Sequence, residues 1–334
     1  MTDMLKDARN CYEKSLVISN EELLEMMVLD GCFIAELIHK FANGSLWSDP
    51  IFNVDQIIGA IFKDLTLVEN QLPFSVLWKL FGKIKEDPSR CIFAILKMFE
   101  GNMPGLRASE GNSYNENSMK DVKHLVDLLR TNWLPSENFM REYEEVTEDG
   151  EWSFIRSATE LREAGIKFKK VKVEGGSLFD IKFANGKLYI PVVTIDDDAE
   201  RLLRNIIACE QFDYSGSPQY LTEYRKVMDC LINTGKDVEL LCRKRIIDNW
   251  LGTDEAVAEL FNTLGKVMLS RRNFFYAKLF NDVNSHYYKP WHKRMASLRH
   301  NYFNTPWALI SFIAAAFLLL LTLLQTTFTI FPRS

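Results

Sequence analysis

One uninterrupted apolar segment near the C-terminus limits what this chain can fold into. Residues 307–324 read WALISFIAAAFLLLLTLL, and the two hydroxyls in it, on Ser311 and Thr322, can bond to their own helix. Core helices of soluble proteins are rarely apolar on every face over such a length. At about 1.5 Å per residue the run extends roughly 27 Å, close to the roughly 30 Å hydrocarbon core of a bilayer. It therefore predicts a transmembrane helix.

The sequence also marks the two ends of this span. Pro306 suits a first helical turn, and the uncharged residues that follow position 324 supply the remaining length, so we expect a helix over 306–328 and a tail over 329–334. This predicts a single-pass protein with the lipid bilayer as a partner. The expected anchoring residues are Pro306, Trp307, Leu318, Leu319, Leu320, Leu321 and Leu324.

Charge on the flanks of the span predicts its orientation. Between positions 283 and 306 there are no acidic residues and four basic ones, namely Lys289, Lys293, Arg294 and Arg299. After the span there is only Arg333. Positive flanks stay on the cytoplasmic side, and residues 1–10 lack the apolar core of a signal peptide. We therefore expect a cytosolic head, and the plasma membrane rather than an endomembrane.

Residues 291–305, just before the span, form a basic amphipathic juxtamembrane segment. Apolar residues recur there at helical spacing, with basic residues between them. Two interpretations stay open: a helix lying on the membrane surface, and a helix docked on the head.

The rest of the chain reads as a mainly α-helical head, of α+β class. Hydrophobic residues make up 47% and charged residues 25%, which is ordinary for a folded protein. Apolar periodicity divides the head into a helical part over 1–100, a polar loop over 101–120, and a second part over 121–290. Capping boxes at Ser19 with Glu22 and at Ser157 with Glu160 predict two helix starts. Helices are expected over 19–42, 55–69, 72–86, 91–99, 122–130, 198–213, 219–233, 237–250, 254–270 and 271–288.

One stretch, about 169–195, shows the alternation of β-strands instead. Asn185-Gly186 is a strong signal for a two-residue hairpin turn. We expect a three-stranded antiparallel meander, with Pro191 on an edge strand because proline cannot donate to a sheet ladder.

Several polar or reactive segments are more ambiguous. The loop over 101–120 is predicted to be exposed, either as a variable recognition element or as a solvated spacer. Residues 137–151 read as an acidic connector. The six cysteines, none in a C-x-x-C unit, are expected to be reduced core thiols.

The sharpest polar cluster is Asp196, Asp197 and Asp198. Three carboxylates suggest a divalent cation site, but the same residues suit a helix N-terminus, with Asp197 as the cap and Glu200 in the first turn. We favour the cap, because the alternating ligands and glycine of a calcium loop are lacking. Asp30, on the apolar stripe of the first helix, is expected to be paired structurally rather than catalytic.

No sequence motif of a known catalytic or cofactor site is present. Phosphate-binding glycine loops, dinucleotide fingerprints and nucleophile elbows are absent, and the five histidines lack metal-ligand spacing. We therefore expect no catalytic residues, no cofactor and no metal. The net charge of −5 gives no basic field for nucleic acid.

Ordered motifs along the chain resemble a plant family called domain of unknown function 247. They include Cys11-Tyr-Glu, Met27-Val-Leu-Asp-Gly-Cys-Phe, Leu67-Val-Glu-Asn-Gln-Leu-Pro-Phe, His124-Leu-Val-Asp-Leu-Leu-Arg, Arg204-Asn-Ile-Ile-Ala-Cys-Glu-Gln and Tyr302-Phe-Asn-Thr-Pro-Trp-Ala. The resemblance implies a plant membrane protein anchored at its C-terminus and brings no catalytic residues with it. Some grass members of the family are implicated in self-incompatibility, which implies recognition. Family members usually carry a further N-terminal portion before the Cys-Tyr motif, so we expect this chain to lack it.

The leading hypothesis is thus a membrane-anchored recognition or signalling component that binds an unknown protein or peptide partner. The alternatives are an unrecognised enzyme and a truncated, inactive paralogue.

Overall fold

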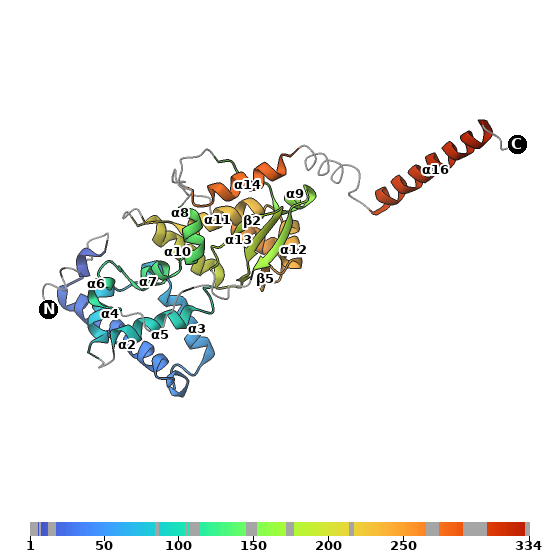
Figure 1. The fold of residues 1–334 in the computed structure, drawn as a ribbon. Helices are drawn as coiled ribbons and strands as arrows, with labels where there is room; N and C mark the ends of the chain where they lie inside the picture. Colours follow the sequence, from blue (N-terminus) through green and yellow to red (C-terminus); the bar gives the residue numbers. More distant parts are fainter. Residues whose placement is uncertain are drawn as a thin grey trace.

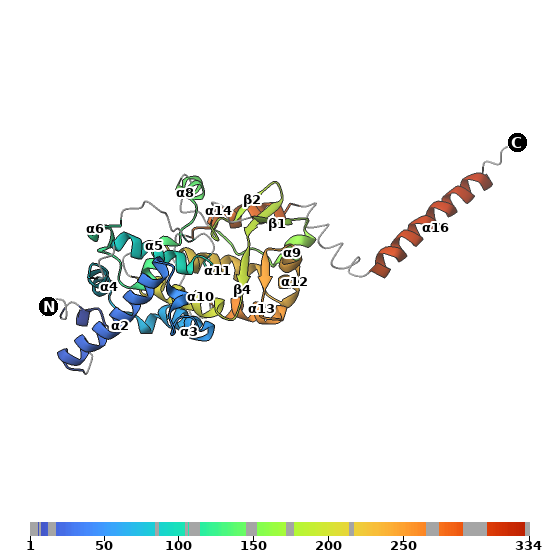
Figure 2. The same cartoon turned by 90° about the horizontal axis from the view of Figure 1, so that it is seen from below.

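A computed structural model describes residues 6, 8–12, 18–83, 87–103, 106, 114–144, 152–171, 177–213, 217–264, 274–289 and 306–330. Helices dominate it, as the sequence predicts, and one long C-terminal helix stands apart from the rest of the chain (Figures 1 and 2). The arrangement of the few strands differs from the expectation.

The N-terminal part is a group of helices packed around the first long one. Its elements are α2 (Asn20–Ala42), η1 (Leu46–Ser48), α3 (Asp55–Leu65), η2 (Val68–Asn70), α4 (Phe74–Phe81) and α5 (Pro88–Phe99). Ser19 and Glu22 form the predicted capping box at the start of α2. This helix buries a narrow stripe centred on Leu23, Met27 and Ile38 and packs it against α4 and α5.

Two segments expected to be polar connectors contain helix and core residues. Within 101–120 the structure places the short helix α6 (Glu116–Met119), and it buries Met103 and Leu106. Within 137–151 it places α8 (Glu137–Glu144). Phe139 on α8 is buried beside Phe275 and Tyr276, with ring centroids 5.4 and 6.4 Å away. Apolar residues that are sparse in the sequence therefore reach the core from both segments.

The C-terminal part of the head contains most of the predicted helices. They are α7 (Leu125–Asn132), α9 (Ala158–Glu163), α10 (Ala199–Gln211), α11 (Tyr220–Leu231), α12 (Gly235–Arg243), α13 (Asp254–Thr263) and α14 (Ala277–Tyr287). The predicted helix over 237–250 is wrong at its end. Arg245 adopts a positive φ of 56°, which stops α12 and turns the chain into the strand β5 (Ile247–Asn249).

Both sheets contain parallel pairs, so the expected antiparallel meander is only partly right. The Asn185-Gly186 hairpin joins β2 (Lys182–Ala184) to β3 (Lys187–Pro191), with both turn residues at positive φ. However, β1 (Lys167–Val171) pairs parallel to β3, which makes β3 the central strand. A second sheet joins β4 (Val193–Ile195) in parallel to β5.

Pro191 consequently lies on the central strand, not on an edge. It is the last residue of β3, opposite Val171 at the end of β1. The ladder there is continued by Val192, whose N–H donates to the Val171 carbonyl at 3.3 Å. A proline without an N–H is therefore tolerated at this strand end.

The C-terminal helix α16 (Pro306–Ile330) is longer than the predicted 306–328 span by two residues. Over Ile310–Thr327 none of it is buried, and this is the one helix in the described part of the chain that is long and apolar enough to cross a membrane. Three threonines bond to their own helix: Thr322 to Leu318 at 2.8 Å, Thr326 to Thr322 at 2.7 Å and Thr327 to Leu323 at 3.0 Å.

Candidate functional site

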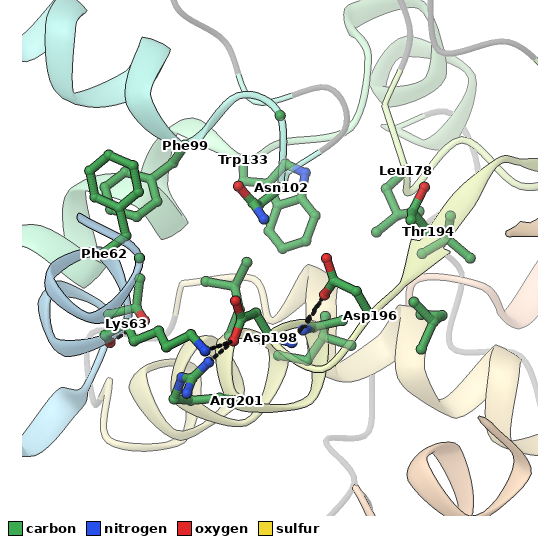
Figure 3. Close-up of a pocket in the computed structure, with 18 residues that line it drawn as sticks. Phe62, Lys63, Phe99, Asn102, Trp133, Leu178, Thr194, Asp196, Asp198 and Arg201 are labelled. Carbon is green, nitrogen blue, oxygen red and sulfur yellow. Dashed lines mark hydrogen bonds and ion pairs between the residues drawn. The ribbon is translucent and has the colours of Figure 1, made fainter. Parts of the chain in front are cut away.

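A cavity of about 200 Å³ lies between the N-terminal helices and the start of α10. One wall comes from α3 and the end of α5, and the other from β4 and α10. Figure 3 shows the rings of Phe62, Phe99 and Trp133 on one side, facing charged side chains on the other. Phe62 and Phe99 are in contact, with ring centroids 5.9 Å apart. The cavity therefore combines an aromatic wall with a charged rim.

Three charged residues form the rim of this cavity. Lys63 Nζ lies 3.0 Å from Asp198 Oδ1, and Arg201 donates to the same oxygen (Figure 3). All three side chains are partly exposed. Burial alone would raise the pKa of the Asp198 carboxyl, yet hydrogen bonds from Lys63 and Arg201 hold that pKa below its ordinary value of 3.8. Asp198 is thus an anion shared by two cations.

The neighbouring Asp196 performs the capping role that the sequence assigned to Asp197. Its Oδ1 accepts from the N–H groups of Asp198, at 3.1 Å, and Ala199, at 2.8 Å. Asp198 is the N-cap residue of α10 and Ala199 is its first residue, so Asp196 satisfies donors at the helix start, whereas the Asp198 side chain makes no cap bond. Asp196 and Asp198 both line the cavity, whereas Asp197 does not. Among the residues with described positions, no three His, Cys, Asp or Glu side chains gather as metal ligands.

A second charged cluster lies inside the head, at the end of α7 that faces α10. Arg130 pairs with Asp127 at 2.8 Å and with Asp213 at 3.1 Å, and Lys123 also reaches Asp213 at 3.0 Å. The Cys209 thiol lies 3.9 Å from Asp127 Oδ1. Burial raises the pKa of that thiol to about 12, with the Asp127 charge adding to the effect. Cys209 is therefore a protonated core residue and not an activated nucleophile.

Residues of the motifs that resemble the family also make hydrogen bonds between internal elements of the head. Gln71 accepts from the Val126 N–H at 3.1 Å and donates to the Leu67 carbonyl at 2.7 Å. Asn205 on α10 accepts from the Val68 N–H at 2.9 Å. These bonds fix η2 against α7 and α10, and so fix the two walls of the cavity relative to each other.

Two buried carboxylates cap helices from a distance. Glu210 accepts from the N–H groups of Leu221 and Thr222, at 3.0 and 2.8 Å, although burial raises its pKa. Asp237 accepts from Thr159 and Thr234. Each carboxylate thus has a structural partner, and sequence patterns gave no sign of either long-range cap.

A large apolar surface lies on α2, on the segment leading to α3 and on the first turn of α3. We call it the N-terminal apolar surface. The packing of Phe33 against Phe52, with ring centroids 5.7 Å apart, joins its two halves. Its exposed side chains are Met26, Val28, Leu29, Phe33, Trp47, Ile51, Val54 and Ile57. Exposed apolar groups on this scale often mark a binding site.

Several predicted positions differ in the structure. Asp30 is exposed on α2, because the buried stripe of this helix is narrower than the apolar pattern. Cys11 and Cys32 are exposed and not in the core, while Cys91 and Cys209 are buried. Of the basic juxtamembrane residues, Lys289 is exposed after α14. The segment 290–305, with Lys293, Arg294 and Arg299, lies outside the described residues.

Comparisons with known proteins agree with the motifs. The sequence profile of a family described as plant protein of unknown function, domain of unknown function 247, matches residues 1–321. The chain is 32% identical to the UPF0481 protein At3g47200 of Arabidopsis thaliana, over 99% of this chain and 72% of that protein. It is 24% identical to the putative UPF0481 protein At3g02645 of the same plant, over 95% and 76% respectively. No solved structure is significantly similar to the chain.

Proposed function

The chain belongs to the plant family domain of unknown function 247, and from that membership we propose that it is a single-pass membrane protein whose head recognises a protein or peptide partner. The proposed role is recognition or signalling, not catalysis. The carboxylates that the sequence singled out support this choice, because Asp196 caps α10 and Asp198 is paired with two cations.

The observation that carries the membrane part of the proposal is the exposure of α16. In its leucine run, Leu318, Leu319 and Leu320 are each more than half exposed, and Leu321 is 47% exposed. Leaving that much apolar surface in water is unfavourable by roughly 25 cal/mol per Å². A bilayer removes it from water, and 25 helical residues, at about 1.5 Å each, are long enough to cross one.

We place the head in the cytosol and the helix in the plasma membrane. The basic residues before α16 support the orientation through the positive-inside rule. The apolar run of α16, together with the uncharged residues after it, is long enough for either membrane, and the plasma membrane is the location that cell fractionation is to test.

The recognition part of the proposal rests on the N-terminal apolar surface. Leu29 is 63% exposed and Trp47 is 58% exposed. Large aromatic and aliphatic groups are the usual anchors of protein interfaces. A partner with a complementary apolar face would bury them.

Membrane anchoring is tested by fractionating plant cells that express the full chain. We expect the chain to stay in the membrane pellet after an alkaline wash, and a variant lacking 306–334 to become soluble. Full-length chain in the soluble fraction would contradict the proposal.

Orientation is tested with glycan acceptors on both sides of the span. Asn43-Gly44-Ser45 is a natural acceptor on an exposed turn after α2. We expect no glycan at Asn43 and a glycan on an acceptor tag added after Ser334. The reverse result, abolished by Asn43→Gln, would place the head on the other side.

Recognition is tested by proximity labelling with the full chain in plant cells. The Leu29→Gln and Trp47→Gln variants should lose a defined set of neighbours, whose direct binding is then measured with purified proteins. Trp250→Gln is the matched control, because Trp250 is 70% exposed but lies outside the N-terminal apolar surface. If both surface variants still label the same neighbours, this surface is not the interface.

A further inference from the structure

Three side chains of the N-terminal apolar surface form a ridge along the outer face of α2. Met26, Leu29 and Phe33 are spaced three and four residues apart, so they follow one another on one side of the helix. All three are exposed. The opposite side of α2 packs against α4 and α5, which leaves this side on the outside of the head (Figures 1 and 2). The ridge is therefore accessible to a partner.

Carboxylates border this ridge on both sides. Glu25 lies one helical turn before Leu29, and Asp30 lies one turn after Met26 on the opposite side of the ridge. Both carboxylates are exposed, and within the described part of the chain neither makes a hydrogen bond or an ion pair. A cationic group of a partner could reach either one.

The segment that builds the surface, residues 18–57, is strongly acidic. It holds seven acidic residues and one basic residue, Lys40, which is already paired with two of those carboxylates. Arg9 and Arg90 reach the segment from elsewhere in the chain and bond to main-chain carbonyls near the two ends of α2. With all three cations counted, the surface keeps an excess of four negative charges. Its partner should therefore be basic.

The backbone of α2 limits the conformation that such a partner can adopt. Between the two helix ends, the N–H and C=O groups of α2 are bonded within the helix, so no free edge is offered to which an extended peptide could add as a strand. A peptide lying on this apolar surface must then satisfy its own backbone groups, and a helix does so. Side chains spaced like Met26, Leu29 and Phe33 also pack well against the apolar face of another helix.

Charge argues against the other common occupants of an apolar surface. A second copy of this chain would place an acidic face against an acidic face, and like charges across an interface are unfavourable. A bilayer that contains anionic lipids would repel the surface for the same reason.

We propose that the N-terminal apolar surface binds a basic amphipathic helix of a partner protein. The apolar face of that helix lies on Met26, Leu29 and Phe33, and its lysine and arginine residues lie beside Glu25 and Asp30. This inference rests on the proposal that the surface is a recognition site, and it specifies the chemistry of the partner.

The test is a titration of the full chain, in nanodiscs of zwitterionic lipid, with fluorescent model helices of about 18 residues. One peptide has leucine at helical spacing and lysine elsewhere, and its twin has glutamate in place of each lysine. Fluorescence anisotropy measures binding, with empty nanodiscs as the blank for each peptide. We expect the basic helix to bind at least about tenfold more tightly than its acidic twin. Added salt should weaken that binding, because it screens exposed charges.

Two sets of substitutions at exposed positions locate the binding. Leu29→Gln removes the central apolar anchor and should weaken binding of the basic helix at least about tenfold. Glu25→Gln combined with Asp30→Asn should weaken it about threefold to tenfold at low salt. Glu255→Gln combined with Glu259→Gln is the matched control, because it neutralises two exposed carboxylates on α13. It should leave binding unchanged.

The proposal is overturned if the basic helix binds no better than its acidic twin, or no better than to empty nanodiscs, or if neither set of substitutions weakens binding. It is also overturned if nanodiscs that carry the chain associate with one another or with added liposomes, and Leu29→Gln abolishes that association. The occupant is then a second copy or a bilayer.

Proximity labelling separates this inference from the proposed function. If Leu29→Gln still removes labelled neighbours but the basic helix does not bind, the surface is a recognition site and only the chemistry assigned to its partner is wrong. If Leu29→Gln removes no neighbours, the recognition site itself is wrong.

Discussion

Arg130 donates two hydrogen bonds, of 2.9 and 2.8 Å, to the same Oδ1 atom of Asp127 on the preceding turn of α7. Both side chains are nearly inaccessible, with 2% of Asp127 and 9% of Arg130 exposed. The family motif that contains both residues therefore builds an internal ion pair. It holds α7 against α10 through Asp213 and Cys209.

Asp127→Ala should destabilise the head strongly, because it leaves Arg130 buried with one partner fewer. Loss of one member of a buried pair costs about 3 kcal/mol or more. Urea unfolding of the full chain in a nonionic detergent, followed by tryptophan fluorescence, measures this. Glu239→Ala, which breaks the exposed pair with Arg243, is the control and should change little. Equal effects of the two substitutions would show that burial is not the cause.

Asp237 should make the stability of the head depend on pH in the acid range. Burial alone would raise the pKa of Asp237, but hydrogen bonds from Thr159, Thr234 and Asn233 hold it below its ordinary value of 3.8. A lowered pKa contributes stability that is present above 3.8 and is lost as the pH falls through the folded-state pKa. Asp237→Asn should therefore be less stable at neutral pH and should show a weaker loss on acidification.

This dependence is measured by unfolding at a series of pH values from neutral to below 3. Asp55→Asn, at an exposed position on α3, removes a carboxylate of the same kind and should leave the acid part of the curve unchanged. An Asp237→Asn curve parallel to that of the natural chain would rule out this source of acid sensitivity.

The capping box of α2 is the simplest feature to test from sequence. Ser19 Oγ accepts from the Glu22 N–H at 3.1 Å. Ser19→Ala should lower the free energy of unfolding by about 1 kcal/mol, because that donor loses its partner. Ser19→Asp keeps an acceptor and should retain most of the stability. The urea midpoint of unfolding is measured for both variants. A lower midpoint for Ser19→Ala than for Ser19→Asp attributes the loss of stability to the missing acceptor, and equal midpoints would contradict this.

Charge in the centre of α16 should prevent membrane insertion. The double substitution Leu319→Arg and Leu320→Arg places two cations near the middle of the helix. Each cation raises the free energy of membrane insertion by about 2.5–3.5 kcal/mol. A glycan-acceptor tag after Ser334 should then lose its glycan in a membrane insertion assay. Thr322→Leu is the control and should insert as the natural chain does. Glycosylation of the double variant would argue against α16 as the spanning segment.

Local signals predicted the local features of the fold. The box at Ser19, the box at Ser157 and the Asn185-Gly186 turn each depend on residues within a few positions of one another, and all three are present. The pairing of β1 with β3 depends on strands separated in sequence by other elements, and β4 meets β5 only after three helices. No short pattern encodes such a register, which is why the mixed sheet was missed.

The candidate site shows the same limit. The aspartates at 196–198 stood out in sequence, and their capping role could be anticipated from the helix that follows them. Lys63 could not be assigned to them, because its contact with Asp198 joins α3 to α10 across more than a hundred residues. The exposure of Asp30 could not be predicted either. The pattern of a helix shows which face is apolar, but it does not show how much of that face a neighbouring element covers.

The threonines of α16 have a consequence for how this protein would behave within a bilayer. Interhelical hydrogen bonds from hydroxyls are one of the forces that pair helices in lipid. Thr322, Thr326 and Thr327 instead donate to carbonyls of their own helix. Each of these hydroxyls already has an acceptor on α16, so within a bilayer none of them would need an acceptor on a neighbouring helix to satisfy its hydrogen bond.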